Sequence, residues 1–399
     1  RLVCNSMIYF IALLILVIPV FRFDLMKIEG NRKLWLVLEY IILVAIAAFR
    51  YRVGGDTLIY MDLFEDYPTI GELTTFDYES AVYNPMWYVY NSVFKTFGDS
   101  FALFQLVHAI IVNTVFLKFF KRYTDFYFSA ILIYYIGYYF YFNMEVLREV
   151  LCVSIMLWAF PYLQEKKFIR YYLFCFLALS IHMSAALMFL LPLMLLFKKD
   201  SFWFSLFVIV AIVVLLKVVD IITIVLSLAF EGQLAASIKA YMDLEAPNMI
   251  GAMVQFLICV PFVILMFVRN WYHFENDNLM GAFMMVVVAI QTFGMFIPAF
   301  PRFSNYLLPF GIVYIVNTFY LNYWEIRSHH LATILVSSAL CIYMFNLTYF
   351  YLKNKSEDLK GAHVYNRYLP YHTIFDPQSD KTREQLLLNE RAKTSIFGN

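Results

Sequence analysis

The chain has 399 residues, of which 62% are hydrophobic and only 15% charged, and its formal net charge at pH 7 is +1. A soluble domain has about 45–50% apolar and about 25% charged residues, so this composition excludes an ordinary soluble protein and indicates a polytopic membrane protein. The chain has no basic tract, and we therefore expect no nucleic-acid partner. The five cysteines are dispersed without a CxxC pair, which argues against a disulfide framework or a zinc site.

Apolar segments near or above the about 20 residues that cross a bilayer recur along the whole chain. The first apolar segment, residues 7–21, has no small-residue cleavage site after it. We therefore interpret this segment as a retained span rather than a signal peptide. Segments 168–181 and 183–197 are short, and could instead form one long tilted helix or a re-entrant pair. The sequence predicts an all-α protein of about twelve transmembrane helices at 3–21, 34–49, 101–120, 126–142, 147–163, 168–181, 183–197, 202–229, 250–269, 279–299, 303–323 and 331–351.

Two further segments complete the predicted organisation. Residues 83–97 are too short and too polar for a span, and we interpret them as an interfacial or re-entrant piece. Residues 1–352 are predicted to form the transmembrane domain, and 353–399 a polar C-terminal tail that contains the aromatic stretch "YNRYLPYHTIF". The chain shows no internal repeat.

Lys and Arg collect in the short loops 22–33, 118–125, 164–170, 197–200 and 325–330. The positive-inside rule places such loops in the cytoplasm. Loop 56–79 is acidic and contains no Lys or Arg, as expected of an outside loop. If residues 83–97 do not cross the membrane, the basic loops all fall on the cytoplasmic side and the acidic loop falls outside. Both termini then lie outside.

Charged side chains within or at the ends of apolar segments require a reason, because one at the centre of a spanning helix costs about 2.5–3.5 kcal/mol. Arginine matches phosphate oxygens in bidentate geometry, so converging arginines at headgroup depth indicate a lipid-linked phosphate or diphosphate. Under the predicted topology the outer side carries Arg50, Arg52, Asp56, Glu145, Arg148, Glu149, His182, Arg302, Arg367 and His372.

The sequence offers three candidates for a general base. His182, in "LSIHMSAA", ranks first because no charged neighbour in the sequence pairs with it. Glu145 and Asp56 are the rivals on the same face. Roles other than catalysis or ligand binding stay open for these residues. They are a structural role for His182, headgroup anchoring for the arginines, and a local ion pair between Arg148 and Glu145 or Glu149.

For two other features of the sequence, a role outside the functional site is favoured. His108 lies in the middle of an apolar segment and is expected to be structural. Asp62, Glu65 and Asp66 could bind a divalent metal, but without a DxD spacing a solvated acidic loop is favoured. We expect neither a metal nor a cofactor.

Four stretches in this order, "RYRVGGDTLIY", "NMEVLREVLC", "SIHMSAA" and "PRFSNY", resemble the EpsG family of exopolysaccharide proteins, relatives of the Wzy O-antigen and capsule polymerases. Glu149 and Cys152 depart from the family's Arg-Gln-x-x-Ala pattern. The positions that match its motifs are Arg50 (or Arg52), Gly54, Asp56 and Tyr60, then Arg148, His182, and finally Arg302 with Tyr306.

The resemblance implies a GT-C-like glycosyltransferase that joins undecaprenyl-diphosphate-linked oligosaccharides at the outer face of the bacterial inner membrane, without a metal. Donor and acceptor would both be lipid-linked glycans, and a chain-length regulator is a candidate protein partner. The implied catalytic residues are His182, Glu145 and Asp56. The implied substrate-binding residues are Arg50, Arg52, Tyr60, Arg148, Glu149, Arg302 and Tyr306.

Two other functions also require a membrane protein with outward-facing charges. A flippase or exporter of lipid-linked oligosaccharides would also need arginines, but along a path through the membrane and commonly with repeat symmetry. A membrane O-acyltransferase of surface glycans commonly carries an Arg-x-x-x-His motif, which this chain lacks.

Overall fold

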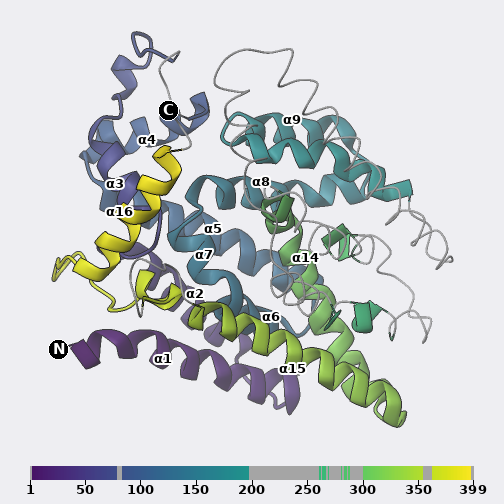
Figure 1. Ribbon diagram of the computed structural model, residues 1–399. Helices are drawn as coiled ribbons and strands as arrows, with labels where there is room; N and C mark the ends of the chain where they lie inside the picture. Colours follow the sequence, from purple (N-terminus) through teal and green to yellow (C-terminus); the bar gives the residue numbers. More distant parts are fainter. Residues whose placement is uncertain are drawn as a thin grey trace. The chain divides into compact units, whose positions relative to one another are not determined.

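The computed structural model describes residues 2–78, 83–196, 300–353 and 362–396, with scattered positions between 260 and 287. The described chain is helical (Figure 1), and its only β contacts are isolated bridges from Arg50 to Thr373 and from Thr373 to Asp376. The predicted spans 202–229, 250–269 and 279–299 lie wholly or largely outside these residues. The chain forms two compact units, residues 1–190 with 348–387, and residues 191–347 with 388–399.

The first unit holds the residues of most interest for function. Its helices are α1 (Leu2–Pro19) with η1 (Val20–Leu25), α2 (Arg32–Ala48), α3 (Thr57–Glu65), η2 (Ile70–Glu72), α4 (Pro85–Gly98), α5 (Phe101–Tyr123), α6 (Tyr127–Tyr134) with η3 (Tyr135–Tyr139) and α7 (Phe140–Met144), α8 (Leu147–Gln164), α9 (Phe168–Leu179), most of η4 (Met183–Leu196), η7 (Val364–Arg367) and the start of α16 (Lys381–Ile396). In the second unit the described helices include α14 (Phe300–Leu321), η6 (Asn322–Ile326) and most of α15 (His330–Leu352).

Polar residues between apolar segments set the helix boundaries. The side chain of Asn31 caps α2 by accepting from the Leu34 N–H at 3.0 Å, and Ser100 caps α5 by accepting from Leu103 at 3.3 Å. Pro85 begins α4, where a missing N–H costs nothing. A break at residues 145–146 bends α8 by 120° from the continuous helix before it, which places Glu145 between two apolar helices.

Helices α5, α2 and α8 pack together, with α5 in contact with both of the others, and α9 packs on α8. Phe104, Phe116, Val112 and Leu163 are buried in this packing. By length and composition three described helices could cross a membrane, or up to four if the bent pair 127–164 counts as one. The apolar helices agree with a membrane protein, whereas the number of twelve spans is not established.

The structure bears on the two ambiguous segments. Segment 83–97 contains most of the 14-residue α4 (Pro85–Gly98), whose Met86 N–H donates to Ser180 O and whose Thr96 Oγ1 accepts from Ile70 N–H. Segment 168–197 is two short helices rather than one long one. They lie side by side, because Tyr171 donates to the carbonyl of Met188 at 2.7 Å.

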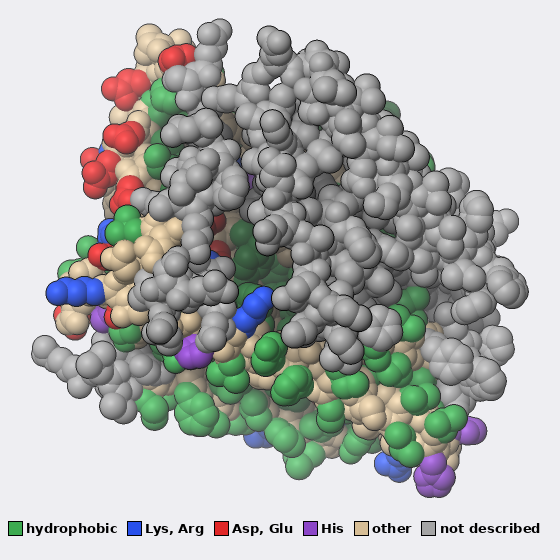
Figure 2. All heavy atoms as spheres, viewed as in Figure 1, with side chains coloured by type: hydrophobic (Ala, Val, Ile, Leu, Met, Phe, Trp, Pro, Cys, Tyr) green, Lys and Arg blue, Asp and Glu red, His purple; other side chains and the backbone are tan. Residues whose placement is uncertain are grey.

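The side chains at the two ends of this packed unit differ in charge. Loops 22–33, 118–125 and 164–170 lie at one end of α2, α5 and α8, and the acidic segment after residue 56 follows the other end of α2. Figure 2 shows acidic side chains gathered over α3 and the segment after it, where the exposed acids are Asp62, Glu65, Asp66, Glu72 and Asp77. We call the end of the unit near loop 49–56 the polar end.

Candidate functional site

The loop at 49–56 connects α2 to α3 and lies against the C-terminal segment. Three backbone hydrogen bonds join them: Tyr51 N–H to His372 O at 2.8 Å, Gly54 N–H to Arg367 O at 2.9 Å, and Ile374 N–H to Phe49 O at 3.0 Å. These bonds supply partners for backbone groups of both segments. The C-terminal segment is therefore part of the polar end rather than an appendage.

Gly54 explains why this loop contains a Gly-Gly step. Its φ is +106°, a backbone conformation that side chains rarely adopt, and a Cβ would collide with the carbonyl oxygen of Met144. Gly55 lies close to Glu145, although less tightly, with 3.1 Å between a Cβ built there and the carboxyl carbon. The two glycines let the loop approach the break that separates α7 from α8.

We expect Gly54→Ala to destabilise the protein by about 2 kcal/mol or more, because it adds backbone strain to a collision with main-chain atoms. The thermal unfolding temperature of the detergent-purified chain would measure this effect. Gly71→Ala is the matched control, since a Cβ there meets nothing within 4 Å. Equal unfolding temperatures for the two variants would contradict the close approach.

Arg50 is a buried structural residue, with only 2% of its surface exposed. Its guanidinium donates to the carbonyl of Ala47 and, at 3.4 Å, to Thr57 Oγ1, and Thr57 donates to Met144 O at 2.7 Å. Burial lowers the Arg50 pKa to about 10, which still leaves it charged at neutral pH. Within the described residues, Arg50 Nε and both ring nitrogens of the buried His108 have no hydrogen-bond partner. Arg50 therefore stabilises the loop and does not present its charge to a ligand.

Arg52 joins the loop to the C-terminal helix. Its Nε donates to Glu384 of α16 at 3.0 Å, and its Nη1 lies 3.9 Å from Asp62 of α3. Figure 1 shows α16 beside α3. Arg383, which is fully buried, strengthens this contact by donating to the carbonyl of Arg52 at 2.7 Å.

Glu145 lies in the break before α8 and is 5% exposed. Its carboxylate accepts from Arg367 Nη1 and from the Tyr368 hydroxyl, both at 2.6 Å. Glu145 therefore pairs with Arg367 and not with its sequence neighbour Arg148. Because both oxygens already accept strong hydrogen bonds, Glu145 has the environment of a structural carboxylate.

Arg148, at the start of α8, has a different environment. Its guanidinium carbon lies 3.7 Å from the ring centre of Tyr83, and its Nε is 3.4 Å from the Tyr60 hydroxyl. Burial raises the pKa of Tyr60 to about 12, so the phenol stays neutral beside the arginine. No carboxylate of the described chain forms an ion pair with Arg148. It is thus a half-buried cation held by tyrosines at a helix N-terminus that no side chain caps.

The structure does not bring Arg52 and Arg148 together. Arg52 contacts Asp62 of α3, whereas Arg148 contacts Tyr60. Side chains two residues apart on a helix point in directions that differ by about 200° around its axis. Asp62 is accordingly exposed and Tyr60 is buried. The two arginines lie on opposite sides of α3.

His182 lies in the turn between α9 and η4. Its Nδ1 accepts from the Ser184 backbone N–H at 3.1 Å and lies 2.7 Å from Ser184 Oγ. A backbone N–H can only donate, so Nδ1 is the unprotonated nitrogen and the neutral ring carries its proton on Nε2. His182 thus caps the start of η4.

The His182 turn lies beside the segment that carries Tyr83. Asn84 donates its side-chain N–H to Leu179 O at 3.2 Å, and the Met86 N–H donates to Ser180 O at 3.1 Å. Tyr83, next to Asn84 in the chain, is the residue that stacks on Arg148. The described part of the candidate site is therefore the group Arg148, Tyr60, Tyr83 and His182.

The other predicted site residues are placed as follows. Asp56 is the half-buried residue before α3, and Glu149 is buried in the first turn of α8. Tyr306 is fully buried within α14 of the second unit. Arg302 lies in the first turn of α14, and its side chain is outside the described residues. Its convergence with Arg148 stays a prediction.

The acidic residues of the first loop, Asp62, Glu65 and Asp66, are exposed. Among the described residues no group of three or more His, Cys, Asp or Glu side chains could hold a metal ion.

Several residues of the polar end were not singled out by the sequence. These residues are Tyr83, Tyr368, Arg383 and Ser184. Their contacts are either with residues far away in the chain or within a local turn, and neither kind of contact has a recognisable sequence motif. The aromatic stretch around Arg367 was the one signal, because it is too rich in tyrosine for a disordered tail.

The first unit combines apolar helices with a polar end at which two tyrosines hold Arg148. These features define a helical membrane protein with a candidate anion site. The model of the EpsG family matches residues 33–373, and the chain therefore belongs to the EpsG family. No curated protein and no solved structure matches significantly. Membership of this family confirms the resemblance and suggests a function like that of a polysaccharide polymerase.

Proposed function

We propose that this protein is a polysaccharide polymerase that joins undecaprenyl-diphosphate-linked oligosaccharide units by glycosyl transfer at the outer face of the bacterial inner membrane. The observation that carries the proposal is Arg148, a cation at a helix N-terminus that the described residues leave without an ion pair. The EpsG family match supports the class of reaction. The basic loops at the opposite end of the unit support the orientation.

In this proposal Arg148 binds the diphosphate of the donor. The reaction breaks the bond between the anomeric carbon and the diphosphate oxygen, and negative charge develops on that oxygen. A positioned guanidinium stabilises this charge more in the transition state than in the ground state. The tyrosines on either side keep the guanidinium in place, and Tyr83 also offers an aromatic face next to the site.

His182 is proposed as the general base for the acceptor hydroxyl. Because Nδ1 is the unprotonated nitrogen and Ser184 Oγ lies 2.7 Å from it, the hydroxyl proton passes to Ser184 as Ser184 gives its own proton to Nδ1. The acceptor oxygen then bonds to the anomeric carbon, the lipid diphosphate leaves, and His182 ends as an imidazolium whose Nδ1 no longer accepts from the Ser184 N–H. Glu145, the rival base, is already bound by two donors.

Arg148→Lys tests the proposed diphosphate contact. Lysine keeps the charge but cannot make two parallel hydrogen bonds or stack on Tyr83, so we expect polymerisation in isolated membranes to fall about 10–100-fold. Glycan chain length and the amount of unreacted lipid-linked unit are the measurements. Arg170→Lys, an exposed arginine of α9, is the control and should leave both unchanged.

Deletion of the gene distinguishes polymerisation from transport. Single repeat units on the lipid carrier at the outer face are expected for a missing polymerase. Absence of surface glycan with lipid-linked units retained in the cytoplasmic leaflet would instead identify a flippase and overturn the proposal.

A further inference from the structure

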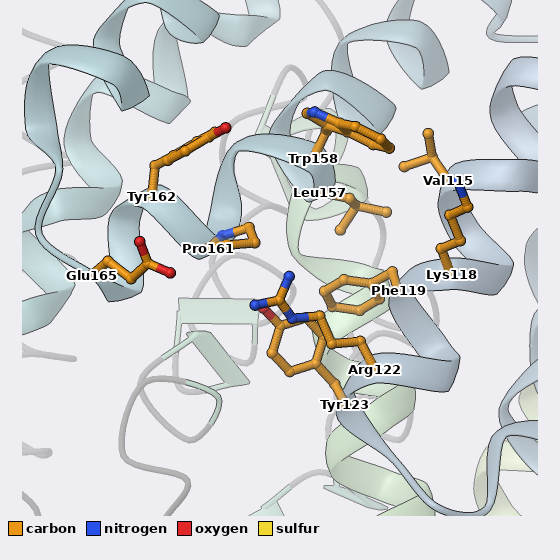
Figure 3. A pocket seen from close by; sticks show the side chains of 10 residues that line it. All are labelled: Val115, Lys118, Phe119, Arg122, Tyr123, Leu157, Trp158, Pro161, Tyr162 and Glu165. Carbon is orange, nitrogen blue, oxygen red and sulfur yellow. The ribbon is translucent and has the colours of Figure 1, made fainter.

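A second polar site lies far from the polar end, between the last turns of α5 and α8. Its cavity has a volume of about 410 Å³, and Figure 3 shows the side chains that line it. Arg148 and Pro161 are thirteen residues apart on α8, which corresponds to about 20 Å along the helix axis. This cavity is therefore distinct from the candidate polymerase site.

Two cations of the same helix face line this cavity. Lys118 and Arg122 are four residues apart on α5, so their side chains lie one above the other. The Lys118 ammonium lies 5.6 Å from the ring centre of Trp158, and the Arg122 guanidinium carbon lies 5.6 Å from that of Tyr123. In Figure 3 the Arg122 guanidinium points into the space between the two helices. Contacts with ring faces hold the cations while their N–H groups remain able to donate to a ligand.

The acidic residue of the cavity, Glu165, forms its ion pair outside the two cations, although its carboxylate also attracts Arg122. Glu165 forms an ion pair with Lys167 at 2.6 Å, and this hydrogen bond lowers the Glu165 pKa. Neither Lys118 nor Arg122 forms an ion pair within the described residues. The C-terminal carbonyls of α5 and α8 also face this end and carry partial negative charge, so the positive charge that attracts an anion here comes from the two side chains.

The remaining wall of the cavity is apolar. Val115, Phe119, Leu157 and Pro161 line it beside the two cations. Trp158 is 51% exposed, as is typical of a tryptophan at the level of lipid headgroups. Cations next to an apolar wall match a phosphate group joined to an acyl chain better than a fully soluble anion.

We propose that this cavity binds the headgroup of an anionic phospholipid, with its phosphate on Lys118 and Arg122 and its acyl chain along the apolar wall. Basic loops 118–125 and 164–170 lie at this end, which places the lipid in the cytoplasmic leaflet if the proposed orientation holds. The bound lipid joins α5 to α8 at the end opposite to the candidate active site. The binding itself does not depend on the polymerase activity.

The test is a titration of the full chain, purified in detergent, with phosphatidylglycerol, in which native mass spectrometry measures the retained lipid. We expect Lys118→Gln and Arg122→Gln each to weaken apparent binding about five- to tenfold, from the about 1 kcal/mol that a cation contributes near an anionic headgroup. Lys121→Gln is the matched control, because Lys121 is exposed on the same helix turn but does not line the cavity.

Three outcomes would overturn the proposal. Equal loss of binding in Lys121→Gln and Arg122→Gln would mean general surface attraction without a site. Equal affinity for phosphatidylcholine would remove the role of headgroup charge. Displacement of the lipid by millimolar inorganic phosphate, with the same dependence on Lys118 and Arg122, would identify a soluble phosphate compound as the ligand.

Discussion

His182→Asn is expected to abolish polymerisation while the protein stays folded. Asparagine can accept the Ser184 N–H as the histidine Nδ1 does, so the cap of η4 is kept. It cannot accept a proton from a hydroxyl, and loss of a general base typically costs about 10²–10⁴ in rate. The rate would be measured in membranes as the conversion of lipid-linked units into longer chains.

This substitution separates the two roles that His182 could have. His182→Ala removes both the cap and the base, so it is expected to lose activity and to lower the unfolding temperature as well. If His182→Asn makes chains of normal length while His182→Ala does not, the histidine is a cap and the base assignment is wrong. Ser184→Ala provides a further check, because it removes the hydroxyl but keeps the backbone N–H; a rate close to that of the unmodified protein would contradict the proposed proton relay.

Arg367→Gln is expected to have the largest effect on stability. It leaves the carboxylate of Glu145 buried without its cation, and breaking a buried ion pair costs about 3–5 kcal/mol. The unfolding temperature of the purified protein would fall accordingly. Arg170→Gln, at an exposed position, should change the free energy of unfolding by less than about 0.5 kcal/mol.

The double variant Glu145→Gln with Arg367→Gln removes both charges and tests the role of Glu145. We expect it to recover much of the stability, because two neutral side chains can still hydrogen-bond to each other and to Tyr368. If Glu145 is structural, activity returns together with stability. A stable double variant without activity would make Glu145 the catalytic base instead of His182.

The C-terminal segment shows why the polar end could be predicted only in part. The sequence predicted that Glu145 and Arg367 would lie on the same side of the membrane, but not that they would touch. The two residues are 222 positions apart, and their contact depends on how the C-terminal segment packs against loop 49–56. A charged residue near the end of an apolar segment has the same sequence signature whether it binds a ligand or another part of the chain.

The sequence by itself determined the helical membrane character, the ends of most of the apolar helices that the structure describes, and the family. These properties follow from local composition, because each apolar segment forms its backbone hydrogen bonds internally and ends where polar residues begin. The tertiary structure decided which charges are structural. It buried Arg50, paired Glu145 with Arg367, and placed Arg52 and Arg148 on opposite sides of α3. Such distinctions depend on packing between distant segments, since burial and pairing determine whether a charge is available to a ligand.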